Sequence, residues 1–376
     1  MRSLPFFLVF LALLLASRTA GAEPRSKWVS AVVPLHPRND GGMAVIPLTA
    51  PSREHPLGTV AIFGQNVVDI ESEGEADRML MAYAWDLDVQ KVIATKPIAK
   101  LPCHRSVVSA VRDGARILLI AGGHDYLERP HENVTLFTID ESLDVVSREV
   151  LGVGDTPSIA ISERWIVAGF FEKRSTAIRP EGMRHMDMRL ALHAVVLDRA
   201  THAVVDARVF QGARLLAPAP QTWLSTHAFA VHGEDLFVSL PGEAEATIVK
   251  ARLPSLTPVK TRVLDRFMVA FGCSPIHVVD DNLVVVTPLG WRLLTFQLDL
   301  RAHTFDRLGE ALAWNPKRAT LLASGAQGKG LPWSSLALDE PCSTTIWAWD
   351  RPVALCTGQE ESDESASTPM RLFRLR

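Results

Sequence analysis

The stretch that decides the fold runs from Ser106 to Val150 and reads SVVSAVRDGARILLIAGGHDYLERPHENVTLFTIDESLDVVSREV. It contains two pairs of alternating or apolar segments: Ser106–Arg112 with Arg116–Gly122, and Val134–Ile139 with Val145–Val150. Asp113-Gly114, between the first two segments, is typical of a tight turn. The stretch therefore predicts a unit of strand, turn, strand, loop, strand, turn and strand.

The same pattern recurs about six times, with a period of roughly 40–55 residues that is typical of radial or stacked β architectures. Further copies are recognisable over residues 158–210, 228–264 and 276–308. The first copy is expected to comprise four strands: Thr59–Gly64, Val67–Glu71, Met79–Trp85 and Lys91–Thr95. The last copy offers three: Ser335–Leu338, Val353–Thr357 and Met370–Leu375.

The last copy runs out of chain before a fourth strand, and Trp28–Leu35 near the N-terminus is an unassigned one. Pairing the two would hide both exposed strand edges. This strand pattern resembles that of the β-propeller family over nearly all of the chain, although no WD40, kelch or NHL motif is present. The resemblance implies an all-β, six-bladed propeller, closed by pairing of the N-terminal strand with the last blade. Seven blades remain an alternative because Met43–Leu48 and Ala319–Ser324 also read as strands, and two packed β domains are another.

An acidic residue follows the third strand in most copies of the unit. These residues are Asp86, Asp140, Asp198 and Asp299. Asp accepts hydrogen bonds from nearby backbone N–H groups in turns. We therefore expect each of them to organise the turn that leads to the outer strand.

The N-terminus reads as an export signal. Arg2 supplies a positive charge, Phe6–Ala16 is an apolar run, and Ala20-Gly21-Ala22 is a small-residue cleavage site. We expect residues 1–22 to be a signal peptide and residues 23–376 to be a single propeller domain, which is secreted or lies in the periplasm or cell envelope. The mature chain contains no apolar run long enough for a membrane span. The formal net charge of −3, with both signs interspersed, argues against a nucleic-acid partner.

The chain contains four cysteines, and an exported chain with an even number of them favours disulfides. Four cysteines allow three pairings. We favour a disulfide between Cys342 and Cys356, which lie close in sequence. For Cys103 and Cys273 a bond across the channel mouth and two free thiols remain open.

The resemblance also implies where a ligand would bind, because propellers commonly bind ligands on the face that bears the loops between second and third strands. Loops on a rigid scaffold often carry function. The binding candidates from these loops and from the connections between blades are His104, His124, Asp125, His131, His185, Asp187, His227 and Trp333. Three of them, His124, His131 and His185, are candidate ligands for a transition metal.

No cofactor is firmly implied, and calcium or a transition metal stays open. The chain lacks the HExxH, EF-hand and GxSxG patterns, so the sequence does not assign an enzyme activity. The leading hypothesis is an exported binding or scaffold module for a protein or carbohydrate partner. The alternative is a metal-dependent hydrolase or lyase of the lactonase-like propeller kind, with its site at the channel mouth.

Overall fold

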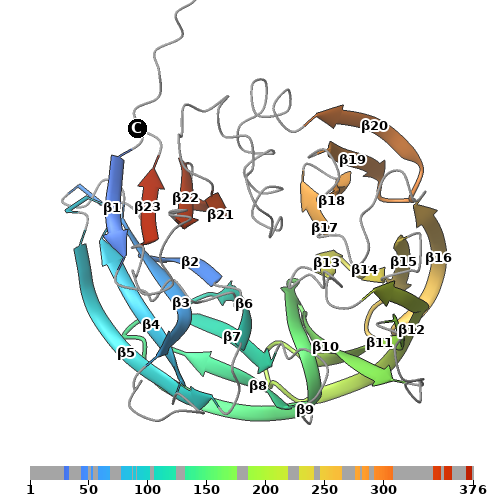
Figure 1. Ribbon diagram of the computed structural model, residues 1–376, viewed down its shortest axis with the longest axis horizontal. Helices are drawn as coiled ribbons and strands as arrows, with labels where there is room; N and C mark the ends of the chain where they lie inside the picture. Colours follow the sequence, from blue (N-terminus) through green and yellow to red (C-terminus); the bar gives the residue numbers. More distant parts are fainter. Residues whose placement is uncertain are drawn as a thin grey trace, which may run out of the picture.

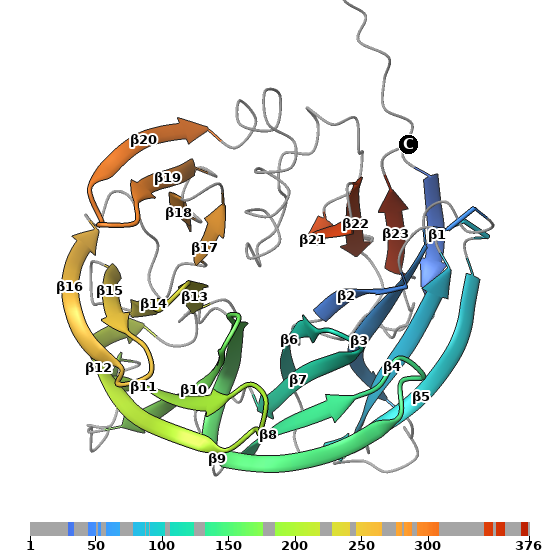
Figure 2. The same cartoon turned by 180° about the vertical axis from the view of Figure 1, so that it is seen from behind.

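The chain is all-β, and its strands are arranged radially around a central axis in the computed structural model (Figure 1). The strands β2, β6, β13 and β17 lie toward the axis, whereas β5, β9, β16 and β20 lie at the periphery (Figures 1 and 2). The structure describes residues 29–33, 44–49, 52–53, 58–67, 78–86, 88–89, 91–101, 106–123, 132–175, 185–218, 228–240, 246–264, 276–279, 282–287, 292–307, 342–348, 351–357 and 370–374. Among these residues no helix is long and apolar enough to cross a membrane.

The described strands form antiparallel groups of four, which is the arrangement of a β-propeller, and we call each group a blade. Blade 1 comprises β2 (Ala44–Thr49), β3 (Thr59–Val67), β4 (Arg78–Asp86) and β5 (Lys91–Leu101). Blade 2 comprises β6 (Ser106–Asp113), β7 (Arg116–Gly123), β8 (Glu132–Ile139) and the first part of β9 (Val145–Ile161). Blade 3 comprises the last part of β9, β10 (Trp165–Ser175), β11 (His185–Asp198) and β12 (Val204–Pro218).

The remaining strands form three more groups. Blade 4 comprises β13 (Phe229–His232), β14 (Asp235–Leu240), β15 (Ala246–Arg252) and β16 (Thr257–Leu264). Blade 5 comprises β17 (Ile276–Val279), β18 (Asn282–Thr287), β19 (Arg292–Gln297) and β20 (Ala302–Arg307). The terminal blade comprises β21 (Cys342–Ala348), β22 (Arg351–Thr357), β23 (Met370–Arg374) and β1 (Val29–Val33).

Strand β9 differs from the sequence-based expectation of two separate strands. Its first part pairs with β8 and its last part pairs with β10, so one continuous strand belongs to two blades. Blades 2 and 3 consequently form a single seven-stranded sheet. Strand pairing thus extends from the outer edge of blade 2 to the inner edge of blade 3, although β9 contains Gly152, Gly154 and Pro157.

The prediction for the two inner strands of blade 1 was wrong. Residues 59–67 form one strand, β3, rather than parts of two. The segment we treated as an extra strand, Met43–Leu48, supplies the innermost strand β2 instead. The reason is burial: Ala44 and Leu48 belong to the same hydrophobic cluster as Phe63, and an inner strand needs apolar side chains to contact its neighbours.

The terminal blade joins the two ends of the chain. Val29 to Val33 of β1 pair with Arg374 to Met370 of β23, so the predicted partnership of the N-terminal strand with the last strand is confirmed. Strand β21, which pairs with β22, was not expected from the sequence. The expected strands Ser335–Leu338 and Ala319–Ser324 lie outside the described residues, as does the whole segment 308–341 between β20 and β21.

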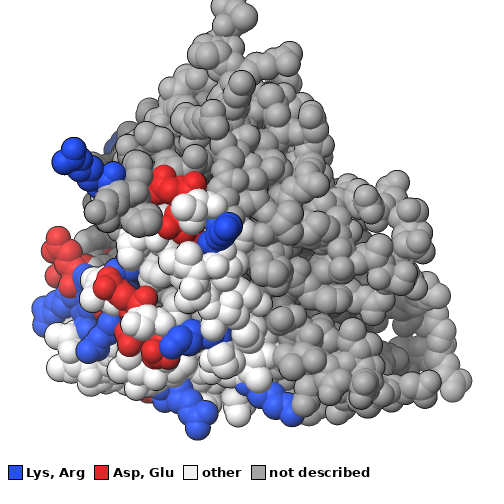
Figure 3. All heavy atoms as spheres, turned by 90° about the vertical axis from the view of Figure 1, so that its left-hand side faces the viewer, with Lys and Arg blue, Asp and Glu red and all other residues white. Residues whose placement is uncertain are grey.

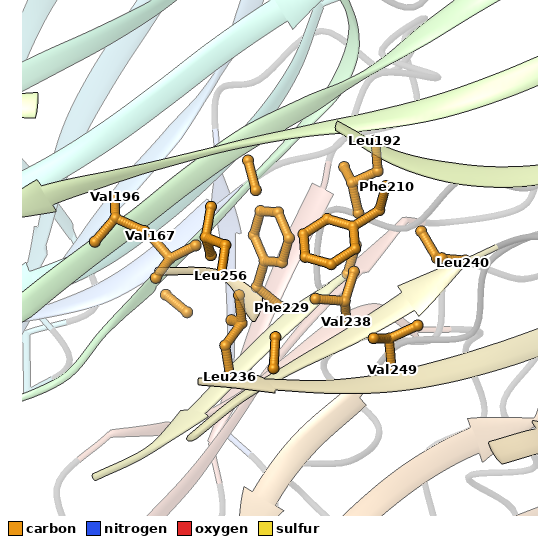
Figure 4. Packing of buried hydrophobic residues seen from close by; sticks show 14 of the residues in the cluster. Val167, Leu192, Val196, Phe210, Phe229, Leu236, Val238, Leu240, Val249 and Leu256 are labelled. Atoms are coloured by element: carbon orange, nitrogen blue, oxygen red, sulfur yellow. The ribbon is translucent and has the colours of Figure 1, made fainter. Parts of the chain in front are cut away.

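The hydrophobic cores lie between neighbouring blades, because successive side chains on a strand point to opposite faces of its sheet. On β7, Ile117 and Leu119 belong to the cluster shared with blade 1, whereas Leu118 and Ile120 belong to the cluster shared with blade 3. Figure 4 shows the corresponding cluster between blades 3 and 4, with Phe229 near its centre. Blades 2, 3 and 4 thus contribute to hydrophobic clusters on both of their faces, which explains apolar runs such as RILLIAG.

The turns before the outer strands behave as predicted. Oδ1 of Asp86, Asp140 and Asp198 accepts hydrogen bonds from backbone N–H groups two to four residues later, and Oδ1 of Asp299 accepts one from Arg301. The sequence did not reveal a second feature of these turns. Leu143, Leu256 and Leu300 adopt positive φ, of 65°, 50° and 65°, and are buried. The left-handed backbone is unfavourable for leucine, and burial of the side chain offsets it.

The turn at Asp198 makes stability depend on pH in a defined direction. The backbone N–H of Thr201, followed by its hydroxyl, holds the pKa of the Asp198 carboxyl below its usual value of 3.8. A carboxyl whose pKa is lowered by folding stabilises the protein above its unfolded pKa and loses that contribution as pH falls. We therefore expect Asp198→Asn to lower Tm at pH 7, and the difference from wild type to shrink below about pH 4. Thermal unfolding from pH 7 to pH 3 checks this, and a constant difference would contradict it.

Candidate binding site at the junction of blades 2 and 3

The candidate site is built on Phe170 of β10, whose ring is directed against the backbone of β9. A Cβ atom added at Gly152 would lie 2.9 Å from Cε1 of Phe170, and one added at Gly154 would lie 2.6 Å from the carbonyl oxygen of Phe171 and 3.1 Å from Cε2 of Phe170. The separations of 2.9 Å and 2.6 Å are shorter than real Cβ atoms show. The two glycines of β9 therefore leave space for the aromatic ring, which is only 4% exposed.

His193 of β11 stacks on this ring. Phe170 and His193 face each other in the β10–β11 ladder. Their ring centroids are 5.0 Å apart and the ring planes differ by 5°. Offset or parallel stacking at this distance is favourable for aromatic side chains. The imidazole of His193 is thus held by a buried neighbour at a fixed position on the sheet.

Glu172 completes the arrangement. Its Oε2 lies 2.7 Å from Nε2 of His193, and the two side chains are 23% and 29% exposed. Glu172 lies two residues after Phe170 on β10, so both belong to the same face of the sheet. The carboxylate accepts the Nε2 proton, which leaves Nδ1 as the acceptor in neutral imidazole. Within the described part of the chain, Nδ1 of His193 makes no hydrogen bond, and a ligand that donates an O–H or N–H group fits this nitrogen.

The site lies toward the end of the blades at which β7 and β10 end and β8 and β11 begin, and we call this end the connection face. Asp155 of β9 faces Phe171 in the β9–β10 ladder and also forms a parallel bridge with Gly123, the last residue of β7. Asp155 is 3% exposed. The next residue, Thr156, has a φ of 44°, which is uncommon for a β-branched residue. Backbone outliers of this kind cluster at binding and catalytic sites.

Most of the residues that the sequence nominated lie outside the described residues. These are His104, His124, Asp125, His131, His227 and Trp333. His185 and Asp187 were expected in a loop, but the structure places both on β11, where they face Pro218 and Leu216 of β12. The expectation was wrong because β11 and β12, with 14 and 15 residues, are longer than any strand of blades 1, 4 and 5. Among the described residues, no group of three His, Cys, Asp or Glu side chains could hold a metal ion.

Sequence reasoning missed His193 and the glycines that support it. His193 was read as an ordinary member of an apolar strand, although it is the polar residue in the run LALHAVVL. The alternation Gly152-Val153-Gly154 at the end of an outer strand was a second signal, since glycine inside a strand often marks a close approach of another group. Neither signal identifies its partner, because Phe170 and Glu172 meet His193 only through the register of two strands.

On the side of the molecule that bears β5, the described residues show no cluster of charge of one sign. Figure 3 shows Lys and Arg interspersed with Asp and Glu over the described residues of this side. The outer strands carry exposed Val next to charged residues, and β16 is exposed along nearly its whole length. Charged side chains on outer strands discourage unwanted strand pairing.

No protein-family model matches the chain, and no curated protein matches it. Solved structures with a similar fold include a protein from Bacteroides fragilis NCTC 9343, with 9% identity, a TM-score of 0.41, and coverage of 95% of this chain and 97% of that one. A neuraminidase-like protein from A/bat/Guatemala/164/2009 has 7% identity, a TM-score of 0.41, and coverage of 93% and 94%. An acylaminoacyl peptidase from Pyrococcus horikoshii has 11% identity, a TM-score of 0.37, and coverage of 82% of this chain but 42% of that one. The assignment to the β-propeller class rests on the chain's own sheet order, not on these likenesses.

Proposed function

We propose that this chain is a binding or scaffold module that engages a protein or glycan partner through the connection face at the junction of blades 2 and 3. The observation that carries the proposal is the Glu172–His193 pair, whose hydrogen bond of 2.7 Å fixes both side chains while leaving each partly exposed. A polar group that is already ordered loses little conformational entropy when a ligand binds it. The pair is therefore suited to recognition.

The support beneath the pair strengthens this proposal. Phe170 is confined by Gly152 and Gly154 on β9 and stacks on His193. The recognition group thus rests on two blades at once, through strands rather than through loops. Sites built on strands with a packed supporting layer hold their geometry better than sites built on loops.

We further propose that the protein is exported and that its blades form a closed ring. Cleavage after Ala22 would release a single propeller of residues 23–376 into the periplasm, the cell envelope or the medium. Six blades, with the last one completed by the pairing of β1 with β23, would form a closed ring. N-terminal sequencing of the exported protein tests the cleavage, and a crystal structure that resolves residues 308–341 counts the blades.

The pair also keeps a second candidate function open, that of a metal-dependent hydrolase or lyase. A carboxylate that orients an imidazole is a common arrangement in general acid–base catalysis and in metal sites. The other candidate ligands of the sequence, His124, His131 and His185, would have to complete such a site. Elemental mass spectrometry of the mature protein tests it: stoichiometric metal that is lost on replacing His124 and His185 would favour the enzyme.

Replacing His193 should weaken partner binding strongly. Removing one partner of a hydrogen bond and leaving the other unsatisfied costs about 1–3 kcal/mol, which corresponds to roughly 5–150-fold in Kd. We expect His193→Ala and Glu172→Gln to reduce capture of partners from envelope and secreted proteins, or binding to immobilised glycans, by at least about fivefold. Quantitative affinity capture with the mature chain, followed by titration of each captured partner, measures the effect.

His232→Ala is the matched control. His232 lies at the end of β13, beside the hairpin turn at Gly233 and so at the end of the blades away from the connection face. It should bind like the wild type. Equal binding by wild type, His193→Ala and His232→Ala would contradict the proposed location of the site. Absence of any bound protein or glycan would contradict the binding function itself.

A further inference from the structure

Two cysteines face each other in the terminal blade. Cys342 is the first residue of β21, and it is the register partner of Cys356 on β22. Facing residues of antiparallel strands have Cα atoms about 4.5–5.5 Å apart, and the Cα atoms of a disulfide are usually about 4.4–6.8 Å apart. We propose that Cys342 and Cys356 form a disulfide that fastens the blade in which the two ends of the chain meet.

The proposed disulfide would stabilise the β21–β22 hairpin because the two cysteines lie at its open end. Cys342↔Cys356 is the last pair of the β21–β22 ladder, at the end away from residues 349–350, which connect the two strands. The register shifts between Cys342 and Thr344, so the backbone pairing is irregular beside the cysteines. A covalent link at this point closes the loop 342–356 and prevents the ladder from opening at its weak end. Closing a loop restricts the unfolded chain and so favours the paired state.

The rest of the terminal blade depends on this hairpin. Strand β23 pairs with β22 on one side and with β1 on the other, so the N-terminal strand is attached to the sheet through β22 and β23. A hairpin that opens at Cys342 and Cys356 weakens the surface on which β23 and then β1 assemble. The proposed disulfide would therefore control how firmly residues 29–33 are held.

Register also selects among the three pairings that four cysteines allow. Cys103 and Cys273 lie outside the described residues, while Cys342 and Cys356 are direct neighbours on adjacent strands. The proposal rests on the export inferred above, because disulfides form in oxidising compartments. A thiolate of one cysteine attacks the disulfide of a thiol oxidase in that compartment. The second cysteine then resolves the mixed disulfide, so that the two protein thiols are oxidised and the oxidase is released as a dithiol.

The bond can be detected directly in the exported mature chain. Chymotrypsin cleaves after Trp347 or Trp349, between the two cysteines, so a non-reducing digest should contain one linked pair of peptides. That species should be two hydrogens lighter than the sum of the free peptides, and reduction should separate it. Free thiols at Cys342 and Cys356, or a bond from either of them to Cys103 or Cys273, would overturn the proposal.

The effect on the N-terminal strand needs matched variants. Reduction should speed hydrogen exchange in residues 29–33 and 370–374 and lower Tm by a few degrees, both in the wild type and in the control Cys103→Ser/Cys273→Ser. In Cys342→Ser/Cys356→Ser exchange should already be fast, and reduction should change nothing further. A wild type whose exchange in these strands does not respond to reduction, although the linked peptide is present, would overturn the proposed role in holding β1.

Discussion

Phe229→Ala is expected to lower the free energy of unfolding by about 3–5 kcal/mol, the usual cost of removing a buried aromatic ring. Phe229 lies on β13, the innermost strand of blade 4, and is 4% exposed. Figure 4 shows its ring among Val238 of its own blade, Phe210 of β12 and Leu256 of the turn before β16. The substitution empties the centre of a core that two blades share.

Urea unfolding of the mature chain measures this effect as a shift of the midpoint. Phe229→Leu is the matched control, because a substitution that nearly conserves volume usually costs less than about 1.5 kcal/mol. Val209→Ala, at an exposed position of β12, should change stability by less than about 0.5 kcal/mol. A loss below about 1.5 kcal/mol for Phe229→Ala would contradict the placement of this ring in the shared core.

Gly169→Ala is expected to cost about 1–3 kcal/mol or more, as overpacking does in a well-packed core. A Cβ atom at Gly169 would collide with the backbone carbonyl oxygen of His193, and it would lie 2.8 Å from Cε2 and Cζ of the Phe229 ring. A side chain can rotate away, but the backbone oxygen belongs to the β10–β11 ladder and cannot. The strand that carries His193 must therefore shift, so partner binding should weaken together with stability.

Combining Gly169→Ala with Phe229→Ala separates the collision with the His193 carbonyl oxygen from the collision with the Phe229 ring. Phe229→Ala removes the ring but leaves the carbonyl of His193, so Gly169→Ala should still destabilise a protein that already carries Phe229→Ala. Gly122→Ala is the matched control, because its Cβ would meet only side-chain atoms of Pro157 and Val134, at 3.2 Å. Urea midpoints of the wild type, Gly169→Ala, Phe229→Ala and the variant with both substitutions form a double-mutant cycle. If Gly169→Ala had no effect in the Phe229→Ala background, the backbone collision would be refuted.

Strand existence and turn chemistry were readable from the sequence because both depend on neighbouring residues. The alternation in Ser106–Arg112, the Asp113-Gly114 turn and the acidic residue after most of the third strands act within a few positions of the chain. The pairing of the N-terminal strand with the last strand was predicted because the last copy of the unit lacks a fourth strand. The assignment of β2 and β3 failed for the opposite reason. Residues 44–49 are selected as the inner strand by contacts with a neighbouring blade, which the local pattern does not contain.

The candidate site also depends on contacts between blades, which the local sequence pattern does not contain. Histidines in polar loops attracted attention because loops often carry function, whereas His193 lies in an apolar strand. Its role depends on cross-strand register with Phe170, on Glu172 two residues further along β10, and on two glycines of β9. These residues span from position 152 to position 193 and meet only when two blades pack. No local pattern of residue types records such a meeting.

By itself, the sequence determined the all-β class, the repeating four-strand unit, the turn residues and the pairing of the two chain ends. Each of these follows from hydrophobic periodicity, from backbone preferences in turns, or from the need to satisfy an unpaired strand edge. Only the tertiary structure decided that β9 serves two blades, that Leu143, Leu256 and Leu300 close the cores from the turns, and that Glu172 and His193 form a pair. The physical reason is that packing between blades and strand register are long-range contacts, whose energies depend on which surfaces meet rather than on the order of residues along the chain.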